Sequence, residues 1–278
     1  MIPRFAQFPK ALAERTRRVT LAGVPAIIAH PDWATPAPTV IWMHGRTVSK
    51  EIDPGRYLRW IRAGIAAVAL DLPGHGERFD AKLQHPDRVL DVVERMLGEI
   101  DHVIDALAAP EFERVVDLER LGVGGMSAGG MVTLRRLCEG HDFVAAAVEG
   151  TTGWLERLFG DEAPSRGPWN VAEKSEQLAR LDPVRHLAGM RPVPMLLLST
   201  TTDRMVPYDA VTGYLDAVRA HYAARGADPG LIRHRAWANT GAPDEHAGFG
   251  RFGNDAKNEQ TAFLQEVFRL PGRGERAG

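Results

Sequence analysis

The chain has 278 residues, enough for one large domain or two small ones. Hydrophobic residues make up 44% and charged residues 25%, the composition of an ordinary water-soluble globular protein. The formal net charge of −2 gives no electrostatic reason to expect binding to nucleic acid or to an anionic membrane surface. The single cysteine, Cys138, excludes an intrachain disulfide and agrees with a reducing, cytoplasmic location.

No stretch of the sequence has the length or composition of a membrane span. The longest apolar run, at 63–70, is far shorter than the roughly 20 residues that cross a bilayer. The N-terminal stretch alternates apolar and basic residues and lacks the continuous apolar core of a signal peptide. We therefore expect a cytoplasmic protein whose partner is a small molecule, and the sequence leaves a homodimer open.

In chain order, the first half of the sequence begins with an alternating segment at 17–31, which predicts an antiparallel hairpin. A continuous apolar run follows at 38–45. A second apolar segment lies at 64–76 and ends in a loop rich in glycine and proline. Such runs are typical of strands buried on both faces of a sheet. Residues 86–109 carry apolar side chains every three or four positions, which predicts an amphipathic helix.

The second half repeats this alternation of strands and helices. The segment "RLGVGGMS" predicts a strand that ends at Ser127, and the residues after it predict a helix. The remaining predicted strands lie at 143–150, 193–203 and 231–240, and the remaining helices at 207–226 and 254–270. Strands that alternate with helices predict an α/β fold: a mostly parallel, twisted sheet with helices on both faces.

One segment departs from this alternation. Residues 151–190 have no strand-like run, so we interpret them as a small helical lid inserted into the fold. One sheet with this insertion accounts for the whole length of the chain. We therefore expect a single domain that spans residues 1–278. The polar residues 271–278 are expected to form a flexible tail.

The segment "GGMSAGG" suggests a reactive serine. Ser127 has a glycine two positions before it and another two positions after it, a frame expected by chance in about 5% of such sequences. The frame lies between a predicted strand and a predicted helix, as a nucleophile elbow requires. The alternative is a tight turn with an inert serine.

A serine hydroxyl becomes a good nucleophile only when a base takes its proton and a third group orients that base. In an elbow fold the chain order is serine, acid, histidine. Asp203 and His246 each follow a later predicted strand, on the edge of the sheet where Ser127 lies. Glu149, after the preceding strand, is the rival for the acid.

A tetrahedral intermediate also needs hydrogen-bond donors for its oxyanion. The residue after the nucleophile, Ala128, would supply one backbone N–H, and Arg46, after the strand at 38–45, would supply the other. Gly45 would let that backbone approach closely. The Arg46 side chain could bind a negative charge on the substrate, but we expect it to pair with a carboxylate such as Glu51 and to shape the loop.

Aromatic residues of the insertion suggest a substrate pocket. Trp154, Phe159 and Trp169, together with His44 at the end of its strand, could line a pocket for the substrate. The same aromatic residues could instead pack the lid onto the body of the protein. Asp71 and His75 in "DLPGHGER" are a poor metal site, because Pro73, Gly74 and Gly76 forbid the helix that would align them, so we expect no metal and a structural role for this loop.

These motifs together resemble a known fold family. "HGRTVSKE", "DLPGHGER", "GMSAGG", "STTTDRMVP" and "EHAGFG" stand in the order seen in α/β-hydrolases. The chain is most similar to small bacterial esterases of the dienelactone hydrolase and prolyl-oligopeptidase-like branch. The resemblance implies an α/β-hydrolase fold, no cofactor, and a triad of Ser127, Asp203 and His246.

The function that we expect is hydrolysis of carboxylic esters with short or medium acyl chains, through an acyl-enzyme. The same triad could act on a lactone, a thioester, an amide or a carbon–carbon bond, and the sequence does not choose among them. A non-catalytic binding protein on the same fold is a more remote alternative. The absence of a propeller domain weakens the case for peptides, and the serine in place of a cysteine nucleophile weakens the case for a dienelactone.

Overall fold

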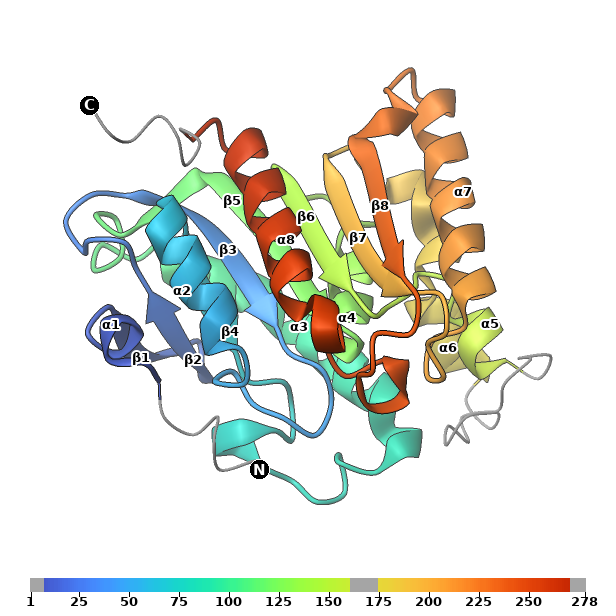
Figure 1. Ribbon diagram of the computed structural model, residues 1–278, viewed down its shortest axis with the longest axis horizontal. Coiled ribbons are helices and arrows are strands. Elements are labelled where there is room, and N and C mark those ends of the chain that lie inside the picture. Colours follow the sequence, from blue (N-terminus) through green and yellow to red (C-terminus); the bar gives the residue numbers. More distant parts are fainter. Residues whose placement is uncertain (1–7, 161–174, 271–278) are drawn as a thin grey trace.

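The computed structural model describes residues 8–160 and 175–270. Its centre is a sheet of eight strands in the order β1-β2-β4-β3-β5-β6-β7-β8 (Figure 1). The strands are β1 (Thr16–Leu21), β2 (Val24–Ala29), β3 (Ala37–Met43), β4 (Ala66–Leu70), β5 (Val116–Met126), β6 (Ala145–Glu149), β7 (Met195–Thr200) and β8 (Ile232–Trp237). β2 pairs antiparallel with β1 and with β4, and all other neighbours are parallel. The predicted hairpin and the mostly parallel sheet are therefore confirmed.

Helices cover both faces of this sheet. They are α1 (Lys10–Ala13), α2 (Pro54–Ala63), α3 (Val89–Leu107), α4 (Ala128–Arg136), α5 (Glu156–Phe159), α6 (Ser175–Leu181), α7 (Tyr208–Ala224) and α8 (Gly253–Val267). α2 and α8 pack on one face, whereas α3, α4 and α7 pack on the other. The expected α/β-hydrolase architecture, with helices on both sides of the sheet, is confirmed.

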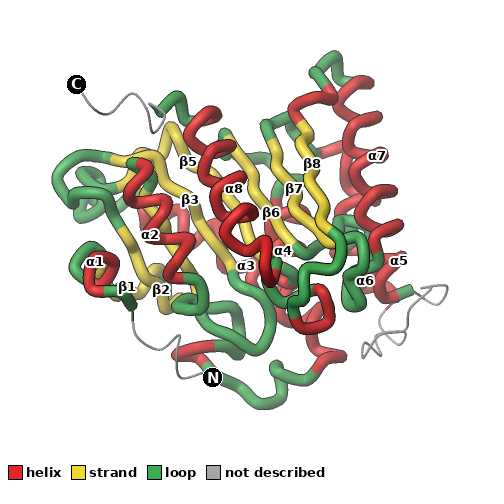
Figure 2. The backbone as a smooth tube through the Cα atoms, in the orientation of Figure 1, coloured by secondary structure: helices red, strands yellow, loops and turns green. Residues whose placement is uncertain are grey.

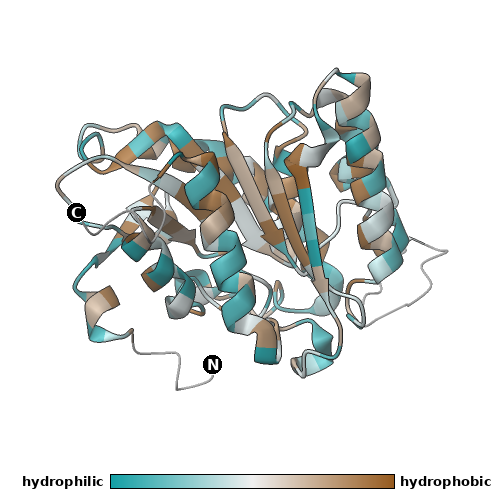
Figure 3. Cartoon of the chain, turned by 45° about the horizontal axis from the view of Figure 1, so that its top comes forward, coloured by the Kyte–Doolittle hydropathy of each residue, from teal (hydrophilic) through white to brown (hydrophobic). Residues whose placement is uncertain are grey.

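Alternation along the strands divides the core into two layers. Ile27 and Val40 face the layer with α2 and α8, whereas their neighbours Ile28 and Ile41 face the layer with α3 and α4. Successive side chains of a strand point to opposite faces, so a strand that is apolar at every position must be covered on both sides. In Figure 3 the hydrophobic colour accordingly gathers on the central strands, and hydrophilic patches lie on the covering helices.

The order of the strands determines where a ligand can bind. The chain crosses from β3 to β4 on one side, and β5 then pairs with the other side of β3. Ligands of open α/β sheets bind beyond the carboxyl ends of the strands at such a reversal. The loops after β3 and β5, which carry Arg46 and Ser127, meet at this point, and loops gather along the same edge in Figure 2.

The insertion is helical in its described part, as predicted. Within its described residues, 151–160 and 175–190, the insertion contains α5, α6 and a 3-10 turn (Pro183–Gly189) but no strand. The predicted tail, 271–278, lies outside the described residues. None of the helices in the described part of the chain is long and apolar enough to cross a membrane.

Candidate active site

Ser127 lies on a strained turn between β5 and α4. Its backbone has φ 52° and ψ −117°, a conformation that residues with side chains rarely adopt. The Ser127 N–H donates to the carbonyl of Glu149 at the end of β6, with 2.9 Å between nitrogen and oxygen. Strain of this kind persists only where the surrounding structure enforces it, and it often marks a functional residue.

The glycines around Ser127 are required by close packing of the backbone. A Cβ atom at Gly125 would lie 2.5 Å from the carbonyl carbon of Gly129, and one at Gly129 would lie 2.2 Å from the carbonyl oxygen of Met43. Both distances are shorter than real Cβ contacts, and the obstructing atoms belong to the backbone, which cannot easily move. The turn therefore brings α4 directly against the end of β3.

Two side chains from other loops join Ser127 in a chain of hydrogen bonds. His246 Nε2 lies 2.9 Å from Ser127 Oγ, and His246 Nδ1 lies 2.8 Å from Asp203 Oδ2. A carboxylate can only accept hydrogen bonds, so Nδ1 carries the ring proton and Nε2 is left to accept from the serine hydroxyl. The structure thus brings together the three residues that chain order suggested.

Backbone hydrogen bonds fix both partners. The second carboxylate oxygen of Asp203 accepts from the N–H groups of Met205 and Val206, at 2.7 and 2.8 Å. The loop of His246 is held by Thr200, whose hydroxyl donates to the carbonyl of Glu245 at 2.5 Å. The Asp203 side chain is only 3% exposed and that of His246 12% exposed, so these two hydrogen-bonded side chains lie mostly away from water.

Glu149, the rival for the acid, is committed to another partner. Its Oε1 lies 2.6 Å from a guanidinium nitrogen of Arg56 on α2, and both side chains are buried. Burial raises the pKa of Glu149, although the Arg56 charge opposes the shift. Glu149 contributes its backbone carbonyl to the serine turn, while its carboxylate faces α2 and not the imidazole.

The two expected oxyanion donors lie close to the serine. Ala128 is the first residue of α4, so its N–H has no carbonyl within the helix to bind. The loop after β3 passes directly over the serine, because a Cβ atom at Gly45 would lie 3.5 Å from Ser127 Cβ. Arg46 is the next residue of that loop.

The expected pair between the Arg46 and Glu51 side chains does not form. The Arg46 guanidinium donates to the carbonyl of Gln84, in the loop that precedes α3. Glu51 instead accepts from the Ser49 hydroxyl at 2.8 Å and lies 3.2 Å from the Lys50 ammonium. The backbone turns at Thr47, where φ is 63°, between these two residues, and each side chain binds a partner on a different segment.

The expected pocket residues have different positions. His44 is buried, so it offers no surface to a substrate. Its Nε2 accepts from the Leu72 N–H and so supports the loop after β4. Phe159 is buried in the core, and Trp154 packs against α7 beside Gly213. Both aromatic residues therefore hold the insertion to the body of the protein. Trp169 lies outside the described residues.

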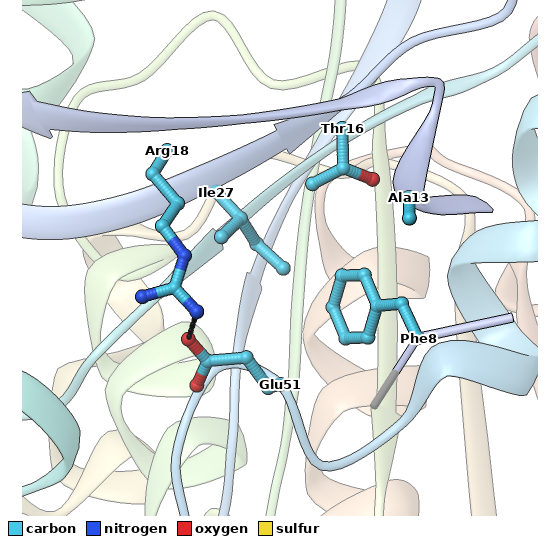
Figure 4. A pocket seen from close by; sticks show the side chains of 6 residues that line it. All are labelled: Phe8, Ala13, Thr16, Arg18, Ile27 and Glu51. Atoms are coloured by element: carbon cyan, nitrogen blue, oxygen red, sulfur yellow. Dashed lines mark ion pairs between the residues drawn. The ribbon is translucent and has the colours of Figure 1, made fainter. Parts of the chain in front are cut away.

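The described residues contain a cavity of about 220 Å³, but it lies away from the serine. Figure 4 shows its lining, in which Arg18 and Glu51 face each other as an ion pair. The lining residues are Phe8, Ala13, Thr16, Arg18, Ile27 and Glu51. β1 and β2 stand at the opposite end of the strand order from β7 and β8, which position Asp203 and His246.

The loop after β4 forms no metal site. Asp71 binds the buried Lys50 ammonium, and His75 Nδ1 donates to the Pro73 carbonyl at 2.8 Å. Among residues 8–160 and 175–270, no three histidine, cysteine, aspartate or glutamate side chains gather as metal ligands do.

The helix α2, which carries Arg56, is not among the elements predicted from the sequence. A usable signal was present: Asp53 before Pro54 is typical of a helix start, and the Asp53 carboxylate accepts from the Arg56 N–H at 3.3 Å. Gly64 closes the helix with φ 85°.

Most of the sequence matches one known protein family. Residues 61–270 match the model of the prolyl oligopeptidase family. The chain belongs to this family. The match spans β4 to α8 and includes all three residues of the hydrogen-bonded chain.

Two bacterial proteins have related sequences. YitV of Bacillus subtilis (strain 168) is 29% identical over 219 residues, which cover 73% of this chain and 84% of that protein. Esterase YjfP of Escherichia coli (strain K12) is 27% identical over 197 residues, covering 68% of this chain and 78% of that protein.

Among solved structures, TT1662 from Thermus thermophilus has the same fold. Its TM-score is 0.69 at 21% identity, and the alignment covers 92% of this chain and 99% of that one. The expected resemblance to the prolyl-oligopeptidase-like branch of the α/β-hydrolases, and with it the expected class of hydrolases, is confirmed.

Proposed function

We propose that the protein hydrolyses carboxylic esters with short or medium acyl chains, with Ser127 as the nucleophile. The observation that carries the proposal is the continuous hydrogen-bonded chain from Asp203 through His246 to Ser127. The name of the related Esterase YjfP supports the choice of an ester over other acyl compounds.

The proposed chemistry follows from this geometry. His246 Nε2 takes the proton of Ser127 Oγ as the oxygen attacks the ester carbonyl, and Asp203 stabilises the imidazolium that forms. The N–H groups of Ala128 and Arg46 donate to the oxyanion of the tetrahedral intermediate. His246 then gives its proton to the leaving alcohol, and the same base activates water to release the acyl group from Ser127.

The size of the insertion supports short or medium acyl chains. In its described part, the large apolar side chains of Leu155, Leu158 and Phe159 are buried in the core. They are therefore not free to cover a long acyl chain, which needs an extended apolar surface to leave water.

Amide hydrolysis is the second candidate, because the family is named for an oligopeptidase. The same triad would serve, with His246 giving its proton to a leaving amine. An anilide carrying the same acyl group as an ester distinguishes the two activities.

The test is hydrolysis of p-nitrophenyl acetate, butyrate, octanoate and palmitate and of the matching p-nitroanilides. We expect the highest kcat/KM among the first three esters, lower values for palmitate, and still lower values for the anilides. Ser127→Ala, with folding checked by thermal melt, should lose at least about a thousandfold in kcat.

Three results would contradict parts of this proposal. A maximum at palmitate would reject the chain-length assignment, and anilides cleaved as fast as esters would favour the amidase. Equal turnover by wild type and Ser127→Ala would place the activity at another site.

A further inference from the structure

A lysine ammonium is buried at the active edge of the sheet. The Lys50 side chain has no exposed surface, and its Nζ lies 2.7 Å from Asp71 Oδ2 and 2.6 Å from Glu77 Oε1. Glu51 lies 3.2 Å away. Lysine is almost never fully buried unless it is paired, so these carboxylates are what allows the ammonium to stay there.

This cluster ties together two loops of the edge. The backbone N–H of Lys50 donates to Asp71 Oδ1 at 2.9 Å, and the N–H of Glu77 donates to Asp71 Oδ2 at 3.0 Å. Tyr57 on α2 donates its hydroxyl to the carbonyl of Lys50 at 2.8 Å. The side chain and the backbone of Lys50 thereby fix the loop after β3 to the loop after β4 and to α2.

The fixed loop is the one that carries the proposed oxyanion donor. It passes over Ser127 at Gly45, continues through Arg46 and reaches Lys50 four residues later. Between them, Thr47 has φ 63°, which is a strained conformation for a β-branched residue. Such a conformation persists only when surrounding contacts enforce it. The Lys50 anchor lies three residues after Thr47 and supplies contacts of this kind on its C-terminal side.

We propose that Lys50 is a positioning residue for the oxyanion site. Its ion pairs with Asp71 and Glu77 hold the loop so that the N–H of Arg46 lies where the oxyanion develops. The inference rests on the proposed serine hydrolase function. Lys50 itself touches no substrate, and it acts through the Arg46 backbone.

A role for Lys50 as a proton-transfer group is disfavoured by its surroundings. Burial alone would lower the pKa of its ammonium, but the hydrogen bonds from Nζ to Asp71 and Glu77 outweigh burial and raise it. The ammonium therefore stays protonated at neutral pH and serves as a fixed cation.

The test compares Lys50→Met with wild type on p-nitrophenyl butyrate. We expect kcat to fall between about tenfold and a thousandfold, up to the loss of one oxyanion donor, while KM stays within about threefold. The affinity for a trifluoromethyl ketone, which forms a tetrahedral adduct with the serine, should fall in parallel with kcat, because the adduct needs the same donor.

Arg136→Met is the matched control. Arg136 is also mostly buried and ion-paired, with its Nε 2.8 Å from Asp101, but it lies at the far end of α4 from Ser127. This variant should lower Tm without lowering kcat. If Lys50→Met does the same, Lys50 has only a structural role and the inference is wrong.

Glu77→Ala is a second variant, which tests the inference even if Lys50→Met does not fold. The Glu77 side chain is half exposed, so its loss leaves the core intact while it removes one of the three carboxylates. We expect a smaller loss of kcat at unchanged KM, and an unchanged kcat would overturn the inference. A wild-type protein that neither cleaves esters nor binds the ketone would instead reject the proposed function, and this inference with it.

Discussion

Ser127 and its neighbours meet two requirements with one turn. The glycines at 125 and 129 are needed because backbone atoms of Met43 and Gly129 occupy the space of a side chain. The same close approach places the serine at the start of α4, with its hydroxyl 2.9 Å from the imidazole of His246. Tight packing and the presentation of a nucleophile are therefore not competing explanations for the small residues here.

At the same scale, the choice of Asp203 as the acid can be tested. Asp203→Asn should lower kcat for p-nitrophenyl butyrate by on the order of 10³–10⁴, because an amide neither stabilises the imidazolium nor holds the ring in the right tautomer. Its Tm should change little, because an asparagine oxygen can still accept the N–H groups of Met205 and Val206.

Glu149→Gln is the control for that experiment. It removes one of the two carboxylates that pair with buried Arg56, the other being that of Asp53, so we expect the free energy of unfolding to fall by up to about 3 kcal/mol. Its kcat should stay within about tenfold of wild type, since the carboxylate does not contact His246. A loss of kcat as large as that of Asp203→Asn would make Glu149 the acid.

Among the elements, the loop after β4 is built around Asp71. A Cβ atom at Gly76, where φ is 57°, would lie 2.1 Å from the Asp71 carboxylate, so the loop wraps closely around this group. Burial would raise the pKa of Asp71, but its hydrogen bonds, including those from Lys50, lower it below the ordinary value. The carboxylate thus stays charged and keeps Lys50 in place at any pH near neutral.

His75 in this loop predicts a pH dependence of stability. Burial lowers the pKa of His75 from 6.5 to about 4, so the folded protein excludes a proton that the unfolded chain binds. The stability tied to neutral His75 is complete above pH 6.5 and is lost as the pH falls toward 4. The integrated effect is at most about 3 kcal/mol.

Urea unfolding of wild type and His75→Asn at pH 7 and at pH 4.5 measures this effect. We expect the stability of the wild type to fall more than that of the variant. Other histidines with a lowered pKa, His30, His141 and His234, titrate in both proteins and cancel in the difference. An equal fall in both proteins would show that His75 titrates alike in the folded and unfolded chains.

For the molecule as a whole, the sheet was predictable because its strands are buried on both faces and therefore form continuous apolar runs. α2 could also have been found, because Asp53 before Pro54 marks its start and the apolar residues Tyr57, Trp60 and Ile61 lie on one helix face. The burial of Arg56 beside them could not be predicted. Its buried partners, Glu149 and Gln260, lie far away in sequence.

The candidate site divides in the same way. Ser127, Asp203 and His246 could be placed from the sequence, because each follows a strand and parallel strands end at one edge. The partners of Arg46 and Lys50 could not, because they depend on the path of a loop that reverses at Thr47. Ion pairs between loops depend on such local conformations, which hydrophobic periodicity does not encode.

Covalent labelling of the folded protein with a fluorophosphonate, with the modified residue located by mass spectrometry, tests whether the triad activates Ser127. We expect one adduct, on Ser127, that forms in wild type and is lost in Ser127→Ala and in His246→Ala. An adduct on another serine, or labelling of Ser127 that is equally fast without His246, would contradict the claim that this triad activates the nucleophile.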